Sequence, residues 1–182
     1  MPFSVPEDCS IAIAAAKRAL EGTNGTDGWN QMNLKKRLVM ISTLTDLIER
    51  DRDHLKVLEA VDSGVPYTSN NVVSKQLELA AVSDVSEALS VMRFHLANAS
   101  QVEFPNNGSC VLDPVGVIAA IISWKAPLST LAEIMTPALI YGNTLVIKVS
   151  ETSPLTALHV ASLVTASGLP KGVVNFITGE NL

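Results

Sequence analysis

Apolar and polar positions divide the second half of the chain into short apolar runs and longer helical patterns. Apolar residues dominate three short runs, at 115–122, 144–149 and 173–177. Runs of this length are typical of strands that a parallel sheet buries on both faces. Helical spacing separates them at 128–140 and 154–168, and the second helix is expected to bury one face. That expected face consists of Leu155, Leu158, Ala161 and Leu163. Two successive βαβ units predict a parallel sheet.

The first half has the spacing of amphipathic helices. Four helices are expected, at 7–21, 33–50, 54–61 and 69–97. Asn33 is a good N-cap for the second of them. Asn107-Gly108 lies between two apolar-containing runs, which predicts a hairpin over 101–112 because both residues accept positive φ. We therefore expect one α/β domain over 1–182, with a helical part at 1–100 and a half Rossmann-like sheet (βαβαβ) at 113–182.

Composition limits the partners and the compartment. The net charge of −5 and the lack of a basic run argue against nucleic acid or an anionic membrane as partner, and no apolar run is long enough to span a bilayer. Cys9 and Cys110 form neither a disulfide framework nor a metal-ligand cluster, so no metal is expected. The segment Met1-Pro2-Phe3-Ser4 lacks the pattern of a secretory signal. A reduced, cytoplasmic protein is the expectation.

Several short motifs in the second half belong together. In chain order they are Ile121-Ile122-Ser123-Trp124-Lys125-Ala126-Pro127-Leu128, Pro137-Ala138-Leu139, Gly142-Asn143-Thr144, Lys148-Val149-Ser150-Glu151, Pro154-Leu155-Thr156-Ala157-Leu158 and Gly172-Val173-Val174-Asn175. This order and spacing resemble the aldehyde dehydrogenase superfamily. The first half resembles its N-terminal helical region more loosely, at Trp29, Arg37, Asp62-Ser63-Gly64 and Pro66. The resemblance implies that region plus the first half of a cofactor-binding domain.

The resemblance also implies a cofactor site at the carboxyl ends of the strands. It implies that Lys148 and Glu151 hold the hydroxyls of an adenosine ribose, and a carboxylate is able to accept two hydroxyl protons. Spacing alone favours a simpler interpretation, an exposed ion pair with a helix N-terminal acid. The resemblance further implies that Ile122, Ser123 and Trp124 line the nicotinamide side, although Trp124 is also compatible with ordinary packing.

Lys125 is the main departure from the family pattern. The resembling family carries asparagine there, whose amide stabilises an oxyanion, and lysine supplies charge without that geometry. We hypothesise that Lys125 is catalytic in a substrate pocket bounded by Trp124 and Ser129, where desolvation would lower its pKa. The alternative is a solvated surface lysine.

Three functional interpretations follow from these residues. In the resembling family the nucleophilic cysteine and the glutamate base lie beyond the part that this chain matches, so the chain alone is not expected to oxidise aldehydes. The favoured interpretation is non-redox binding or catalysis of the isomerase, cyclase or aldol type, with no cofactor required and only weak residual NAD(P) binding. The alternatives are a nucleotide-binding or partner module, and a fragment of an NAD(P)-dependent aldehyde dehydrogenase. Because a half sheet leaves apolar surface uncovered, a homodimer is expected.

Overall fold

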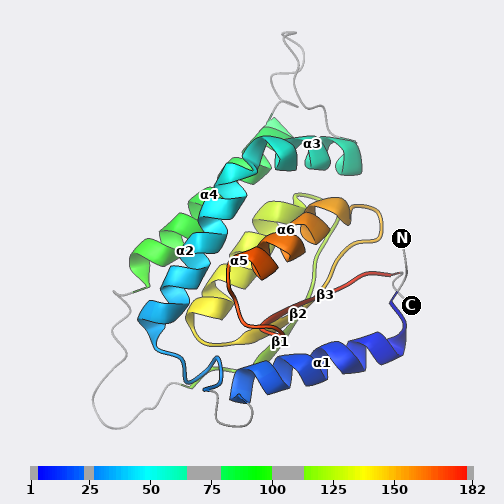
Figure 1. The fold of residues 1–182 in the computed structure, drawn as a ribbon. Helices are drawn as coiled ribbons and strands as arrows, with labels where there is room; N and C mark the ends of the chain where they lie inside the picture. Colours follow the sequence, from blue (N-terminus) through cyan, green and yellow to red (C-terminus); the bar gives the residue numbers. More distant parts are fainter. Residues whose placement is uncertain (1–3, 23–26, 65–78, 100–112, 180–182) are drawn as a thin grey trace.

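The computed structural model describes residues 4–22, 27–64, 79–99 and 113–179 (Figure 1). The helices are α1 (Pro6–Glu21), α2 (Leu34–Arg50), α3 (Arg52–Ser63), α4 (Leu79–Asn98), α5 (Pro127–Ile140) and α6 (Leu155–Ala166). The strands are β1 (Val117–Ile121), β2 (Thr144–Lys148) and β3 (Val174–Ile177). The α/β class, the three strands and the helices between them confirm the sequence prediction.

Local signals explain several of the observed boundaries. The Asn33 side chain accepts a hydrogen bond from the Lys35 backbone N–H at 2.8 Å, so it caps α2 as predicted. Proline opens α1 and α5, where a missing backbone N–H costs nothing. Gly64 adopts a left-handed conformation and ends α3.

The three strands form one parallel sheet in the order β1-β2-β3. Val117 lies opposite Thr144, and Leu145 lies opposite Val174. Four of the five β2 residues are buried, whereas β1 is only partly covered. The sheet therefore has a buried central strand, and the carboxyl ends of all three parallel strands lie at the same end of the sheet.

Helices cover the two faces unequally (Figure 1). On one face α1 crosses the sheet, and Ala16 packs with Val146 and Ile177. On the other face α5 and α6 lie between the sheet and the outer helices α2, α3 and α4. Gly172 is required where α1 passes, because a Cβ there would lie 2.7 Å from the carbonyl oxygen of Ala15.

Two burial predictions are wrong. The first apolar run is not buried on both faces, because the side chains of Val115 and Ile121 are 88% and 79% exposed. In α6 the buried face consists of Thr156, Ala157, Val160, Leu163 and Val164. Of the predicted face, Leu163 is buried as expected, Leu158 and Ala161 are partly buried, and Leu155 is exposed. The hydrophobicity of α6 is nearly uniform around the helix, so it did not specify which side would pack against α3 and the sheet. The expected hairpin over 101–112 lies outside the described residues, as does the start of the fourth helix before Leu79.

Candidate functional site

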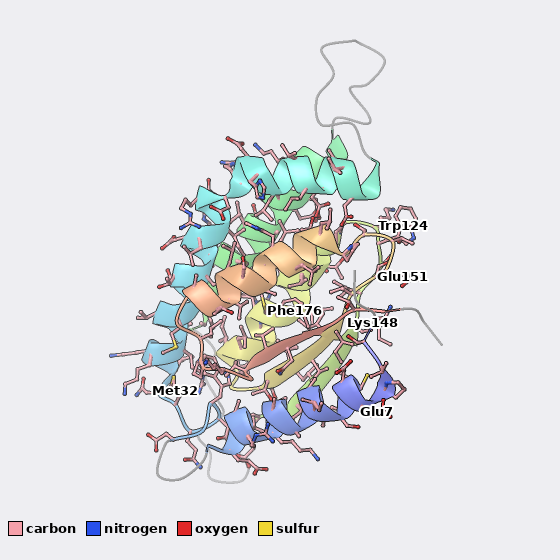
Figure 2. All side chains as sticks on the ribbon, turned by 45° about the vertical axis from the view of Figure 1, so that its right-hand side comes forward. Glu7, Met32, Trp124, Lys148, Glu151 and Phe176 are labelled. Atoms are coloured by element: carbon pink, nitrogen blue, oxygen red, sulfur yellow. The ribbon has the colours of Figure 1, made fainter. Side chains whose placement is uncertain are left out.

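A shallow hollow lies at the carboxyl ends of β1 and β2. It has a volume of about 380 Å³ and is lined by Ile121, Ile122, Ser123, Trp124, Ser150, Glu151 and Thr152. Trp124 is 56% exposed and stands at the rim, while Ile122 is buried in the core. In Figure 2, Trp124, Glu151 and Lys148 all lie at this end of the sheet. Parallel sheets with helical crossovers bind ligands at the carboxyl ends of their strands.

Lys148 and Glu151 form an ion pair at the end of β2. The Lys148 Nζ lies 3.0 Å from Glu151 Oε2, with side chains 18% and 33% exposed. The pKa of Glu151 is lowered, first by its own backbone N–H and then by the hydrogen bond from Lys148. Glu151 is therefore a carboxylate at neutral pH that still has acceptor positions for other donors.

Two hydroxyls flank Glu151 in the same turn. The Ser150 Oγ and Thr152 Oγ1 atoms are 2.9 Å apart, and the Thr152 backbone N–H donates to Ser150 Oγ at 3.3 Å. Ser150 is buried, while Thr152 is exposed. The turn thus carries a carboxylate paired with Lys148 and two hydroxyl side chains that contact each other, which is a suitable surface for a polyhydroxylated ligand.

The turn that carries Trp124 is held by a carboxylate from α4. Asp84, which is 2% exposed, accepts hydrogen bonds from the backbone N–H groups of Leu128 and Ser129 at 3.1 and 3.0 Å. These are free donors of the first turn of α5, and the helix dipole also favours a negative charge there. Ala126, just before α5, has a φ of 48°. This cap from outside the local sequence fixes where the strand-end turn enters α5.

A second carboxylate performs the same task for α6. Asp62 Oδ2 accepts from the Leu155 backbone N–H at 2.6 Å and from Ser153 Oγ at 3.3 Å. Asp62 and Ser153 also line a neighbouring hollow of about 310 Å³ together with Trp124 and Thr152. The two hollows share Trp124 and Thr152, so they adjoin at the strand ends. Asp62 belongs to α3, and α3 therefore forms one wall of this strand-end surface.

Glu59 lies in α3 and is 2% exposed. Burial, followed by the negative charge of Asp84, raises the pKa of Glu59 to about 8. Glu59 is therefore mainly protonated at neutral pH. A neutral carboxyl group in this place avoids a second buried charge beside the cap of α5.

The structure places the remaining candidate residues away from the hollow. Lys125 is exposed and does not line either hollow, so its surroundings lack the desolvation that the sequence argument assumed. The Ser129 side chain is buried and donates to the Ala126 carbonyl at 3.3 Å, as expected of a residue in the first turn of α5. Neither residue is brought against Glu151. A catalytic role for Lys125 stays a prediction.

Sequence reasoning did not identify Ser150, Thr152, Asp62 and Asp84 as parts of this surface. Ser150 and Thr152 flank Glu151, so the strand-end position was a usable signal. Asp62 and Asp84 gave no local signal, because their partners lie 93 and 44 residues away in the chain. Within the described ranges no group of three His, Cys, Asp or Glu side chains is arranged to hold a metal ion. No helix among those residues is both long and apolar enough to cross a membrane.

Comparison with known proteins gives a consistent result. The model of the aldehyde dehydrogenase family matches residues 1–182. The mitochondrial aldehyde dehydrogenases of Mesocricetus auratus and Homo sapiens are each 36% identical over 180 residues, which is 95% of this chain and 33% and 32% of theirs. An aldehyde dehydrogenase of Emericella nidulans is 33% identical over 180 residues, 95% of this chain and 33% of its own. This chain spans about a third of the length of these curated relatives.

Solved structures agree with this result. The NAD+ complex of an aldehyde dehydrogenase from Bacillus cereus matches 98% of this chain and 35% of its own, with a TM-score of 0.81 and 32% identity. The betaine aldehyde dehydrogenase of Staphylococcus aureus, also in complex with NAD+, matches 99% of this chain and 34% of its own, with a TM-score of 0.83 and 30% identity.

Proposed function

Starting from the fact that this chain belongs to the aldehyde dehydrogenase family, we propose that its strand-end surface binds the adenosine ribose of NAD(P). The observation that carries the proposal is the Lys148–Glu151 ion pair at the end of β2, in which Nζ and Oε2 are 3.0 Å apart. Glu151 also lines the hollow at the carboxyl ends of β1 and β2. The chain spans about a third of its relatives, so the proposal concerns nucleotide binding and not aldehyde oxidation. Relatives that match nearly the whole chain are NAD+ complexes, which supports this choice of ligand.

The residues present fit a ribose. A ribose offers two neighbouring hydroxyl groups, and the Glu151 carboxylate accepts from both while Lys148 holds the carboxylate in place. Ser150 and Thr152, the chain neighbours of Glu151, add two hydroxyls that lie 2.9 Å from each other. Trp124, exposed at the rim of the same hollow, offers an aromatic surface for the remainder of the ligand.

The charge of Glu151 predicts a preference between the two nicotinamide cofactors. An unmodified 2′-hydroxyl donates to the carboxylate, whereas a 2′-phosphate brings a second negative charge against it. The pKa of Glu151 is lowered, so this repulsion persists across the neutral range. NAD is therefore the expected ligand, ahead of NADP.

Titration with adenosine monophosphate and its 2′-deoxy analogue tests the role of Glu151 directly. The analogue lacks the proposed hydroxyl donor and should bind about tenfold or more weakly, since a hydrogen bond to a charged group contributes about 1.5–3 kcal/mol. In Glu151→Gln the ratio between the two ligands should fall toward one. Chemical-shift titration of labelled protein measures both affinities even when they are weak.

Glu133→Gln is the matched control, because Glu133 is an exposed glutamate on α5 and lies outside the hollow. This control variant should keep the tenfold ratio. If the unsubstituted chain binds both nucleotides equally, or if Glu151→Gln keeps the ratio, Glu151 does not contact the ribose.

The non-redox interpretation based on Lys125 gains no support from the geometry. Its side chain is exposed, and the residues that line the hollow do not include it. Isomerase, cyclase or aldol-type chemistry requires a pocket that holds the amine against a carbonyl. We therefore favour nucleotide binding, the function of a cofactor-domain fragment.

A further inference from the structure

Two acidic side chains meet in the core between α3 and α4. Glu59 of α3 and Asp84 of α4 are each 2% exposed. Burial, followed by the charge of Asp84 and a hydrogen bond between the two side chains, raises the pKa of Glu59 to about 8. A hydrogen bond between two carboxyl groups requires one proton, so the protonated Glu59 donates and the Asp84 carboxylate accepts.

The surroundings of Glu59 favour this neutral form. α3 packs against α2, α4 and α6. The Thr156 hydroxyl of α6 lowers the pKa of Glu59, but its effect is outweighed by burial and by the negative charges of Asp84 and Asp62. Other charged groups of these four helices are ion-paired beside the first turn of α3, and they are Glu49, Arg50, Asp51, Arg52, Arg93 and His159.

Glu59 also lies between the two carboxylates that cap the helices of the strand-end surface. Asp84 accepts from two backbone N–H groups in the first turn of α5 and so holds the turn that carries Trp124. Asp62 follows Glu59 by three residues on α3, so the two are neighbours on that helix, and it accepts from the Leu155 N–H of α6 at 2.6 Å. The same α3 segment therefore contacts the cap of α5 through Glu59 and forms the cap of α6 through Asp62.

We propose that Glu59 is a positioning residue for the nucleotide site, and that its protonated form is required for the binding conformation of the strand-end surface. The inference rests on the proposed function. The proton joins α3 to α4 through the hydrogen bond with Asp84. With α3 held in this place, Asp62 reaches the first turn of α6 and lines the hollow beside Trp124.

Loss of the proton to solvent breaks this arrangement. Two carboxylates would then be in contact in the core, where neither is well solvated. Asp84 is retained by two N–H groups and by the dipole of α5, so α3 is the element that moves. As α3 moves, Asp62 leaves the Leu155 N–H, and the surface loses its α3 wall.

The pH dependence of adenosine binding tests this inference in the full 182-residue chain. Adenosine has no group that titrates near neutral pH, and the lowered pKa of Glu151 keeps that carboxylate ionised throughout. With a pKa of about 8 for Glu59, about one copy in ten keeps the proton at about pH 9. The dissociation constant should therefore rise about tenfold between about pH 7 and about pH 9.

Glu59→Gln separates positioning from a general effect of pH. The glutamine amide donates to Asp84 at every pH, so this variant should bind adenosine with an affinity that does not change over the same range. Glu87→Gln is the matched control, because Glu87 is an exposed glutamate on α4. The control variant should keep the tenfold change. Circular dichroism at each pH confirms that the proteins are folded.

Nuclear magnetic resonance of the unsubstituted chain gives a second measurement, which needs neither nucleotide nor variant. The carboxyl carbon of Glu59 reports its ionisation, the Leu155 amide reports the cap of α6, and the Trp124 indole N–H reports the strand-end turn. All three signals should titrate with one midpoint. In Glu59→Gln the Leu155 and Trp124 signals should stay constant.

The two measurements distinguish failure of this inference from failure of the proposed function. An adenosine affinity that stays constant while Glu59 ionises overturns the inference, as does a Leu155 amide signal that does not follow Glu59. A pH dependence that Glu59→Gln retains overturns it as well. If adenosine does not bind at any pH, the proposed function is wrong, and the Leu155 and Trp124 signals alone decide whether Glu59 positions the surface.

Discussion

Replacing Glu59 by glutamine should stabilise the protein increasingly as pH rises. Glu59 is 2% exposed, and burial beside the negative charge of Asp84 raises its pKa from 4.5 to about 8. Between these values the unfolded chain has lost the proton that the folded chain retains. Unfolding therefore releases a proton, and the stability that this group contributes is complete below about pH 4.5 and lost by about pH 8.

The size of the effect follows from the pKa change. Each pKa unit corresponds to about 1.4 kcal/mol, so a rise from 4.5 to about 8 sets an upper bound near 5 kcal/mol. Relaxation of the surroundings around an ionised Glu59 reduces this value, since buried sites respond with an effective dielectric constant well above that of dry protein. We expect Glu59→Gln to gain about 2–3 kcal/mol over the unsubstituted chain between about pH 5 and about pH 8.

Urea unfolding followed by circular dichroism, in steps from about pH 5 to about pH 8, measures this difference. Comparing the two proteins at each pH removes contributions that they share, such as the His159–Asp51 contact. Glu87→Gln is the matched control, because Glu87 is exposed on α4 and should give a difference that does not change with pH. A Glu59→Gln difference that is equally flat would refute the assignment of a protonated, buried Glu59.

The remaining predictions concern the chain's packing and chemistry. Gly172→Ala should destabilise the fold by about 2 kcal/mol or more in the same urea assay, because Gly172 has a φ of 89° and a Cβ would meet the Ala15 carbonyl. Gly168→Ala, also at positive φ but with open space around the added Cβ, should cost less. The purified 182-residue chain should produce no NADH from aldehydes, because the one cysteine among the described residues, Cys9, is exposed on α1 and lacks the setting of an activated nucleophile. NADH formation that thiol alkylation abolishes would contradict this.

Local sequence determined the elements of this protein. Short apolar runs, Pro127 at the start of α5 and Asn33 as the cap of α2 are each sufficient signals, because strand and helix boundaries depend mostly on neighbours in the chain. The Lys148–Glu151 pair was also predictable, since three residues separate its members at a strand end. The family motifs then indicated which end of the sheet carries the candidate site.

Tertiary structure alone decided which of these residues are buried and what surrounds the site. Val115 and Ile121 belong to an apolar run like those of β2 and β3, yet they are exposed because no described element lies beyond β1. Asp84 looks like an ordinary helix-surface acid until α5 packs against α4, and so does Glu59 until α4 and α6 pack against α3. Burial and charge state depend on neighbours distant in the chain, and local pattern carries no information about those neighbours.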